Sequence, residues 1–273
     1  MTLLVSWVGV DTHGPASVYI AADSRVTWGA CAHYDHGRKV FACRNSADIF
    51  GYCGDVLFPS MVLAQIVETA DAGLLFEPDS PPSRRAEVVT AKLIEQFSAY
   101  PHDVDGIVSG STIQVIHAAR SEKKPSFECS LLTWTKANSW NKNIVNLPKH
   151  SDVLFSRGSG ATNFQQRYKK YQKGPNADTS RNVFHCFCDS LMNSGVPSVG
   201  GAPQLAGLIR KSESVGRHFG IITGGHRYLL GTRVNELSNF DRIEWRNEKF
   251  EVCDGKTLER KPNSQPQPNP YMQ

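Results

Sequence analysis

The hydrophobic and polar positions of the chain form short strand-like runs separated by blocks of helical spacing. Two apolar runs, 3–8 and 17–22, flank turn formers at 11–15, a pattern typical of a β-hairpin. A second strand pair is predicted at 38–43 and 46–53, across a two-residue turn. The remaining strand-like runs are 112–117, 127–134, 144–147, 153–155, 219–223 and 227–231.

Apolar residues at helical spacing predict two helices before residue 100 and three later ones. The first carries Phe58, Val62 and Ile66 on one face, and the second opens at Pro81-Pro82. The later helices are predicted at about 164–171, 179–193 and 200–212. Runs of strands that alternate with runs of helices predict an α+β fold in packed layers.

The composition predicts a single folded domain followed by a short tail. Residues 1–258 have an ordinary globular pattern, whereas residues 259–273 are rich in Pro, Asn and Gln and bury too little apolar surface to order themselves. A chain of 273 residues is long enough to bury a sizeable core.

Charge gives little indication of a nucleic-acid or membrane partner. The net charge is +4, the Lys and Arg residues are scattered, and no apolar run is long enough to cross a bilayer. One basic run with interleaved aromatic residues, 167–173, could contact RNA or DNA, but a solvated helix face is the favoured interpretation. With no secretory signal pattern at the start, we expect a cytoplasmic protein.

The seven cysteines include no CxxC pair and are odd in number, which predicts reduced thiols. The segment from His185 through Cys186 to Cys188 could suggest a metal site. On a helix, however, adjacent and alternate residues point apart. Core cysteines are therefore favoured, and no metal or cofactor is predicted.

Thr2 is the first candidate for chemistry. Methionine is commonly removed when a small residue follows, so we expect the loss of Met1 to leave Thr2 as the first residue. An α-amino group has a pKa of about 7.7–8.0, so an N-terminal threonine carries a nucleophile and a base on one residue. In most chains such a residue would be an ordinary frayed terminus, and only downstream motifs favour the catalytic interpretation.

Those downstream motifs resemble the proteasome β-subunit family of N-terminal-nucleophile (Ntn) hydrolases, including bacterial proteasome-like peptidases. The matching segments are Ala22-Asp23-Ser24-Arg25-Val26-Thr27, Lys39-Val40-Phe41, Gly51-Tyr52-Cys53-Gly54, Ser156-Arg157-Gly158-Ser159-Gly160 and Gly200-Gly201-Ala202-Pro203-Gln204-Leu205. The interval from Asp23 to Lys39 equals the family spacing. The resemblance extends from residue 2 to about residue 205, and it implies a four-layer αββα sandwich with two antiparallel sheets.

The resemblance also implies roles for individual residues. Thr2 would be the nucleophile, with Lys39 as a neighbouring ammonium group and Asp23 as its carboxylate partner. Arg25 would support this ion network, and Ser159 would support the terminal amine. The Gly54 N–H would stabilise the oxyanion, as such donors do in acyl transfer. Each residue also has a plainer interpretation as a strand, turn or surface residue.

One departure from the family pattern bears on activity. The family places an Asp three residues before its Ser-Gly-Gly, whereas 193–201 here contains no carboxylate, and Ser198 is the nearest substitute. The leading hypothesis is a threonine peptidase that acts on peptides or unfolded proteins and self-associates into a ring or helical homo-oligomer. An ATPase unfoldase is a candidate partner. The alternatives are a non-catalytic proteasome-like subunit and an Ntn amidohydrolase of small amides.

Overall fold

The first strand is an interior strand of a large sheet. The computed structural model describes residues 2–29, 32–104, 107–108, 112–121, 126–210, 215–235, 239–262 and 264. In it, β1 (Leu4–Asp11) and β2 (Gly14–Ala22) form the predicted antiparallel hairpin. The other edge of β1 pairs with β10 (Asp152–Arg157). Because β1 has a neighbouring strand on each side, the residues that precede it lie at the end of an interior strand.

This large sheet has nine strands in the described part of the chain, in the order β10-β1-β2-β11-β12-β13-β14, with β15 attached to β12 and β16 to β15. Its remaining strands are β11 (Gln204–Ile209), β12 (Arg217–Thr223), β13 (His226–Leu229), β14 (Thr232–Arg233), β15 (Trp245–Asn247) and β16 (Val252–Cys253). A short 3-10 helix, Phe240–Arg242, precedes β15.

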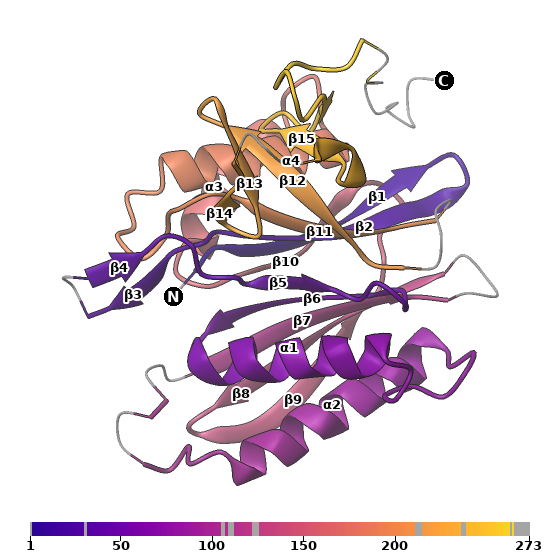
Figure 1. Ribbon diagram of the computed structural model, residues 1–273, viewed down its shortest axis with the longest axis vertical. Helices are drawn as coiled ribbons and strands as arrows, with labels where there is room; N and C mark the ends of the chain where they lie inside the picture. The colour runs from indigo at the N-terminus through magenta and orange to yellow at the C-terminus, as the bar shows by residue number, and fades with distance from the viewer. Residues whose placement is uncertain are drawn as a thin grey trace.

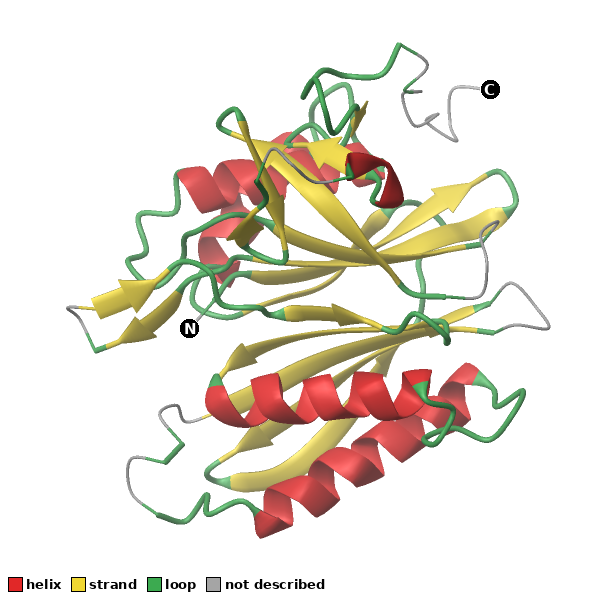
Figure 2. Ribbon diagram, viewed as in Figure 1, coloured by secondary structure: helices red, strands yellow, loops and turns green. Residues whose placement is uncertain are grey.

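A second, antiparallel sheet faces the first. Its order is β5-β6-β7-β8-β9, and its strands are β5 (Val40–Ala42), β6 (Asp48–Gly54), β7 (Thr112–Arg120), β8 (Phe127–Thr135) and β9 (Asn138–Val145). The helices α1 (Leu57–Asp71) and α2 (Pro82–Ala99) cover its outer face (Figure 1). The helices α3 (Ala161–Tyr171) and α4 (Ser180–Met192) cover the outer face of the nine-stranded sheet (Figure 2).

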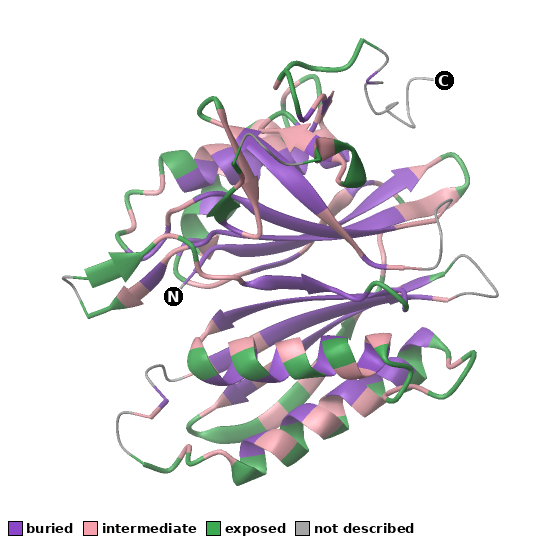
Figure 3. Ribbon diagram, viewed as in Figure 1, coloured by how far each residue is buried: buried purple, intermediate pink, exposed green. Residues whose placement is uncertain are grey.

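The alternation of side chains along β1 explains why the large sheet is buried on both faces. Leu4 and Val8 pack into the cluster between the two sheets. Leu3, Val5 and Trp7 point the other way, into the cluster beneath α3 and α4. Successive residues of a strand face opposite sides, so a continuous apolar run is what a strand covered on both sides requires. Figure 3 shows this burial along the central strands.

The α+β class and the antiparallel sheets agree with the sequence prediction, but two details differ. The structure contains a third, two-stranded sheet, formed by β3 (Val26–Trp28) and β4 (Ala32–Tyr34). This hairpin projects from the main layers (Figure 1). The hydrophobic pattern of the sequence did not predict it as a separate sheet. In addition, β15 runs parallel to β12, so the large sheet is not purely antiparallel.

The helix predicted at 200–212 was wrong. Its residues 204–209 form β11, which lies between β2 and β12. Leu and Ala favour helices locally, but here tertiary packing decides the outcome. At Gly207 an added Cβ would lie 2.5 Å from the ring of Tyr19 on the neighbouring strand β2, so the absence of a side chain at Gly207 leaves room for that ring. Short apolar runs of this kind are ambiguous between helix and strand.

Six cysteines have free, buried thiols, whereas Cys31 lies outside the described residues. No group of His, Cys, Asp and Glu side chains in the described ranges is placed to hold a metal ion. Among the helices that are described, none has the length and apolar character needed to span a bilayer. Most of the predicted tail lies outside the described residues, so the division at 258 stays a prediction.

Candidate active site

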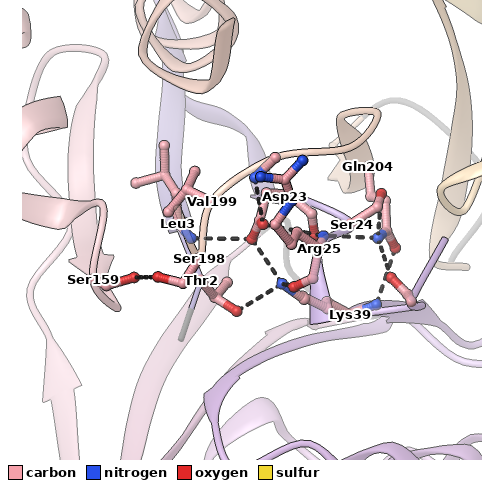
Figure 4. Close-up of polar contacts among 12 residues, drawn as sticks. Thr2, Leu3, Asp23, Ser24, Arg25, Lys39, Ser159, Ser198, Val199 and Gln204 are labelled. Carbon is pink, nitrogen blue, oxygen red and sulfur yellow. Dashed lines mark hydrogen bonds and ion pairs between the residues drawn. The ribbon is translucent and has the colours of Figure 1, made fainter. Parts of the chain in front are cut away.

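Lys39 lies at the centre of a buried polar cluster at the ends of β2 and β1 (Figure 4). It directly precedes β5, and its side chain is 0% exposed. Its Nζ donates to Thr2 Oγ1 at 2.8 Å, to Asp23 Oδ1 at 2.8 Å and to the Arg25 carbonyl oxygen at 2.5 Å. An ammonium group has three hydrogens, so these three acceptors use its full donor capacity.

Asp23 follows the last residue of β2, and its carboxylate is as deeply buried as Lys39. Besides the ion pair with Lys39, Oδ1 accepts the Leu3 N–H at 3.1 Å. Oδ2 accepts the N–H groups of Arg25 at 3.2 Å and Gly200 at 3.1 Å. A buried charge is tolerated when it is paired and hydrogen-bonded in this way, because these contacts replace its lost hydration.

The charge balance around Lys39 has two opposing parts. Burial lowers the pKa of Lys39, while the negative charge of Asp23 acts against that shift. Both effects follow from the low-dielectric surroundings, which disfavour an isolated charge and strengthen attraction between opposite charges. Lys39 is therefore a cation that gives up its proton more readily than a surface lysine.

Arg25 stands beside the cluster and is held by a residue that the sequence analysis missed. Its guanidinium makes two parallel hydrogen bonds to Asp35, at 2.7 and 2.8 Å, and a third to the Pro197 carbonyl oxygen at 3.0 Å. The hydrogen bonds with Arg25 lower the pKa of Asp35 below its usual range. The guanidinium lies against Gly200, where an added Cβ would be only 2.5 Å from its Cζ.

Gln204 is the second residue that the sequence analysis missed as part of the site. It is fully buried at the start of β11. Its Oε1 accepts the backbone N–H of Lys39 at 3.0 Å, and its Nε2 donates to the Gly37 carbonyl oxygen at 2.7 Å and to Ser24 Oγ at 2.9 Å. The wrong helix prediction concealed it, because only β11 brings Gln204 next to Lys39.

Replacing Gln204 by leucine is expected to lower the free energy of unfolding by about 2–4 kcal/mol. The change leaves the Lys39 N–H and the Gly37 carbonyl oxygen buried without these partners. Urea denaturation measures the effect, and Gln172→Leu, at an exposed position after α3, is the matched control. An unchanged midpoint for Gln204→Leu would contradict its role as a buried cross-link.

A glycine-rich turn holds the backbone of Thr2 from the other side. The Gly160 N–H donates to the Thr2 carbonyl oxygen at 3.2 Å. Gly158 has φ +86°, and an added Cβ there would be 2.1 Å from the same oxygen. Between these two glycines, Ser159 Oγ lies 2.9 Å from Ser198 Oγ. The turn thus brings the predicted pair of serines together beside Thr2 (Figure 4).

Gly54 ends β6 with φ +98°, and an added Cβ would be 2.1 Å from the Thr112 carbonyl oxygen. Glycine is therefore required by the backbone at this position. Its neighbour Cys53 is buried, and burial raises the pKa of that thiol to about 12, with the charge of Lys39 acting in the opposite direction. The role of Gly54 as an oxyanion donor stays a prediction.

The geometry therefore joins Thr2, Asp23 and Lys39 directly, places Arg25 next to Asp23, and pairs Ser159 with Ser198. Thr2 is 1% exposed, and Met1 lies outside the described residues. The arrangement can orient a hydroxyl group and stabilise negative charge on its oxygen.

The fold is similar to solved structures of Anbu. A Gly-1 mutant of Anbu from Hyphomicrobium sp. strain MC1 is 15% identical, with a TM-score of 0.54 over 85% of this chain and 88% of that chain. Anbu from Yersinia bercovieri, described as an ancestral beta-subunit, is 11% identical, with a TM-score of 0.54 over 84% and 87% of the two chains. No family model and no curated protein matches the sequence. At these identities the likeness concerns the fold alone.

Proposed function

We propose that this chain is a threonine-type Ntn hydrolase that cleaves peptide bonds once Met1 is removed. The observation that carries the proposal is the position of the buried Lys39 ammonium, 2.8 Å from both Thr2 Oγ1 and Asp23 Oδ1. A cation that donates to the hydroxyl oxygen lowers the cost of an alkoxide at that atom. The fold likeness to Anbu supports the same assignment and a four-layer αββα architecture.

The bonding of the Lys39 ammonium group indicates which group accepts the proton of the Thr2 hydroxyl. The charged form of Lys39 has no lone pair with which to accept a proton, and all three of its hydrogens are already donated to oxygen acceptors. The free α-amino group of Thr2, with a pKa of about 7.7–8.0 in ordinary surroundings, then serves as the base. Lys39 acts by stabilising charge, and Asp23 acts by holding Lys39.

In the proposed reaction, Thr2 Oγ attacks the substrate carbonyl carbon while the α-amino group takes the hydroxyl proton. The carbonyl becomes an oxyanion, for which the Gly54 N–H is the proposed donor. Collapse of this intermediate breaks the C–N bond, and the proton passes from the α-ammonium to the leaving amine. Water then attacks the carbonyl carbon of the Thr2 ester while the α-amino group takes its proton. The bond between that carbon and Thr2 Oγ breaks, the α-ammonium returns the proton to Oγ, and release of the acid restores the threonine.

We further propose that the chain self-associates into a ring or helical homo-oligomer in the cytoplasm and receives peptides or unfolded proteins, with an ATPase unfoldase as a candidate partner. One observation favours a second function, a non-catalytic proteasome-like subunit. Segment 193–201 lacks the carboxylate that the family uses to orient its amine. In its place the two serines, 159 and 198, bond to each other beside Thr2.

The test compares two forms of the protein that differ only at the amino end. One form begins at Thr2, released from a cleavable fusion, and the other carries one additional alanine before Thr2. An amide nitrogen is not a base, so the extended form is expected to hydrolyse unstructured fluorogenic peptides at least about 10²-fold more slowly. Intact mass verifies each amino end. Equal rates above background for the two forms would show that the α-amino group is not the base and would reject the proposed mechanism. Background rates for both would reject the hydrolase and favour the non-catalytic subunit.

A further inference from the structure

A cavity of about 500 Å³ lies next to the proposed site, on the far side of the loop that carries Gly200 and Gly201. The end of α4 and the turn between β12 and β13 form its other walls. None of the steps proposed above uses this cavity. Its volume exceeds that of an extended side chain, so it can admit a ligand group as well as water.

The charge of the cavity wall is one-sided. Two carboxylates, Asp35 and Glu248, line it, and none of the described residues in its lining is Lys or Arg, in a chain that carries 30 Lys and Arg against 26 Asp and Glu. Asp35 is paired with Arg25, which stands behind it. Glu248 accepts a hydrogen bond from the hydroxyl of Thr223, and no described cation forms an ion pair with it.

The negative charge of the wall also affects Cys188. Burial raises the pKa of the Cys188 thiol in the cavity wall, and the carboxylates of Glu248 and Asp189 raise it further. The thiol therefore stays neutral and does not compete for a ligand as a thiolate. What remains available to a ligand is the carboxylate of Glu248.

His36 and Tyr228, two further residues of the wall, suit a cation. His36 Nδ1 lies 2.9 Å from the Gly231 carbonyl oxygen, and since a carbonyl only accepts, Nδ1 carries the hydrogen and Nε2 of the neutral ring is an acceptor. Tyr228 offers an aromatic face, which attracts cations. Leu191 and Met192 add an apolar section that matches an alkyl stem.

We propose that this cavity binds the guanidinium or ammonium end of an alkyl chain, with Glu248 as its main partner. The same chemistry has two sources, a basic side chain of a peptide substrate and a free alkylamine. The peptide source rests on the proposed hydrolase function, whereas the free amine does not.

The cavity is coupled to the buried cluster through one short loop. Gly200 donates its N–H to Asp23 Oδ2 at 3.1 Å and accepts the Ser24 N–H at 3.0 Å, and its other side faces the cavity. The Arg25 guanidinium lies against the same glycine and bonds to Asp35 in the cavity wall. A ligand in the cavity would therefore contact the loop whose Gly200 N–H helps to hold Asp23.

The first experiment measures binding and does not depend on catalysis. Agmatine, a butyl chain with a guanidinium at one end and an ammonium at the other, is titrated into the 273-residue protein at pH 7.5 by calorimetry, with N-butylurea as an uncharged butyl analogue. We expect agmatine to bind at least about 10-fold more tightly than N-butylurea, and Glu248→Gln to remove most of that difference. Glu77→Gln, at an exposed position between α1 and α2, is the control and should bind like the wild type.

A second experiment separates the two sources. Peptides that carry arginine or citrulline at successive positions are titrated into Thr2→Ala protein that begins at residue 2. A preference of about 5-fold or more for arginine at one position, lost in Glu248→Gln, assigns the cavity to a substrate side chain. Agmatine binding without such a preference assigns it to a free amine.

The proposal is overturned if agmatine and N-butylurea bind equally, or if Glu248→Gln leaves agmatine affinity unchanged while circular dichroism shows that the variant is folded. These results are separate from those on hydrolysis. A protein that begins at Thr2 and cleaves no peptide, yet binds agmatine through Glu248, would reject the hydrolase and retain the cation site.

Discussion

Replacement of Thr2 by alanine is expected to reduce peptide hydrolysis at least about 10³-fold, to the background of the assay. The alanine keeps the α-amino group, and its small side chain still permits removal of Met1. It lacks the hydroxyl that Lys39 Nζ contacts at 2.8 Å, together with the γ-methyl group, which the Thr2→Ser variant also lacks. The loss would therefore be assigned to the nucleophile itself. The measurement is the steady-state rate on an unstructured fluorogenic peptide, with intact mass to establish that each variant begins at residue 2.

Thr2→Ser is the matched control, because it retains both the hydroxyl and the amine. We expect this variant to keep measurable hydrolysis and to form a covalent adduct at residue 2 with an electrophilic peptide inhibitor. If Thr2→Ala hydrolyses the peptide as fast as the wild type, the activity belongs to another group or to a contaminant. The threonine mechanism is then wrong.

Replacement of Lys39 by methionine is expected to lower the free energy of unfolding by about 3–5 kcal/mol and to reduce hydrolysis at least about 10²-fold. Methionine is similar in length and apolar, so the main change is the loss of the charge. The buried Asp23 carboxylate then loses its ion-pair partner at 2.8 Å and keeps only its backbone N–H donors. Chemical denaturation and peptide hydrolysis measure the two effects.

A double-mutant cycle separates the charge from packing. Asp23→Asn in the Lys39→Met background removes the unpaired carboxylate, so the double variant should be more stable than the sum of the two single changes predicts. Hydrolysis should not recover, because the cation next to Thr2 is still missing. Lys169→Met, at an exposed position of α3, is the control for loss of a lysine. Additive stability changes would show that Lys39 and Asp23 do not interact as the ion pair described.

The hydrophobic pattern was sufficient where turn signals or a helical period bounded the apolar residues. The hairpin β1–β2 follows from two apolar runs on either side of a cluster of turn formers, and the amphipathic helices α1 and α2 follow from apolar residues at a period of 3.6. The pattern failed at β11, a short apolar run that is buried except for the partly buried Ile209 and that carries no period. It also failed at the hairpin β3–β4, which exposes Trp28 at 61% instead of burying it.

The same contrast holds for the residues of the candidate site, some of which could be recognised in the sequence and some of which could not. The spacing of Thr2, Asp23 and Lys39 could be recognised in the sequence because all three belong to one short ordered motif set. Asp35 and Gln204 could not be recognised. Asp35 is an ordinary residue type with no motif of its own. Gln204 belongs to the matching segment 200–205, but that segment was predicted as a helix, and Gln204 reaches Lys39 only because 165 positions of chain return β11 to the side of β2.

The sequence alone determined the class of the fold, the order of most of its elements and the three residues around which the candidate site is built, since periodicity and motif spacing are local properties. Only the tertiary structure decided that Lys39 is buried with all three hydrogens bonded, that Gln204 and Asp35 support it, and that an acidic cavity lies behind the Gly200 loop. Those features depend on which segments, distant along the chain, come within hydrogen-bonding distance. That distance is set by the packing of the two sheets and not by any local pattern.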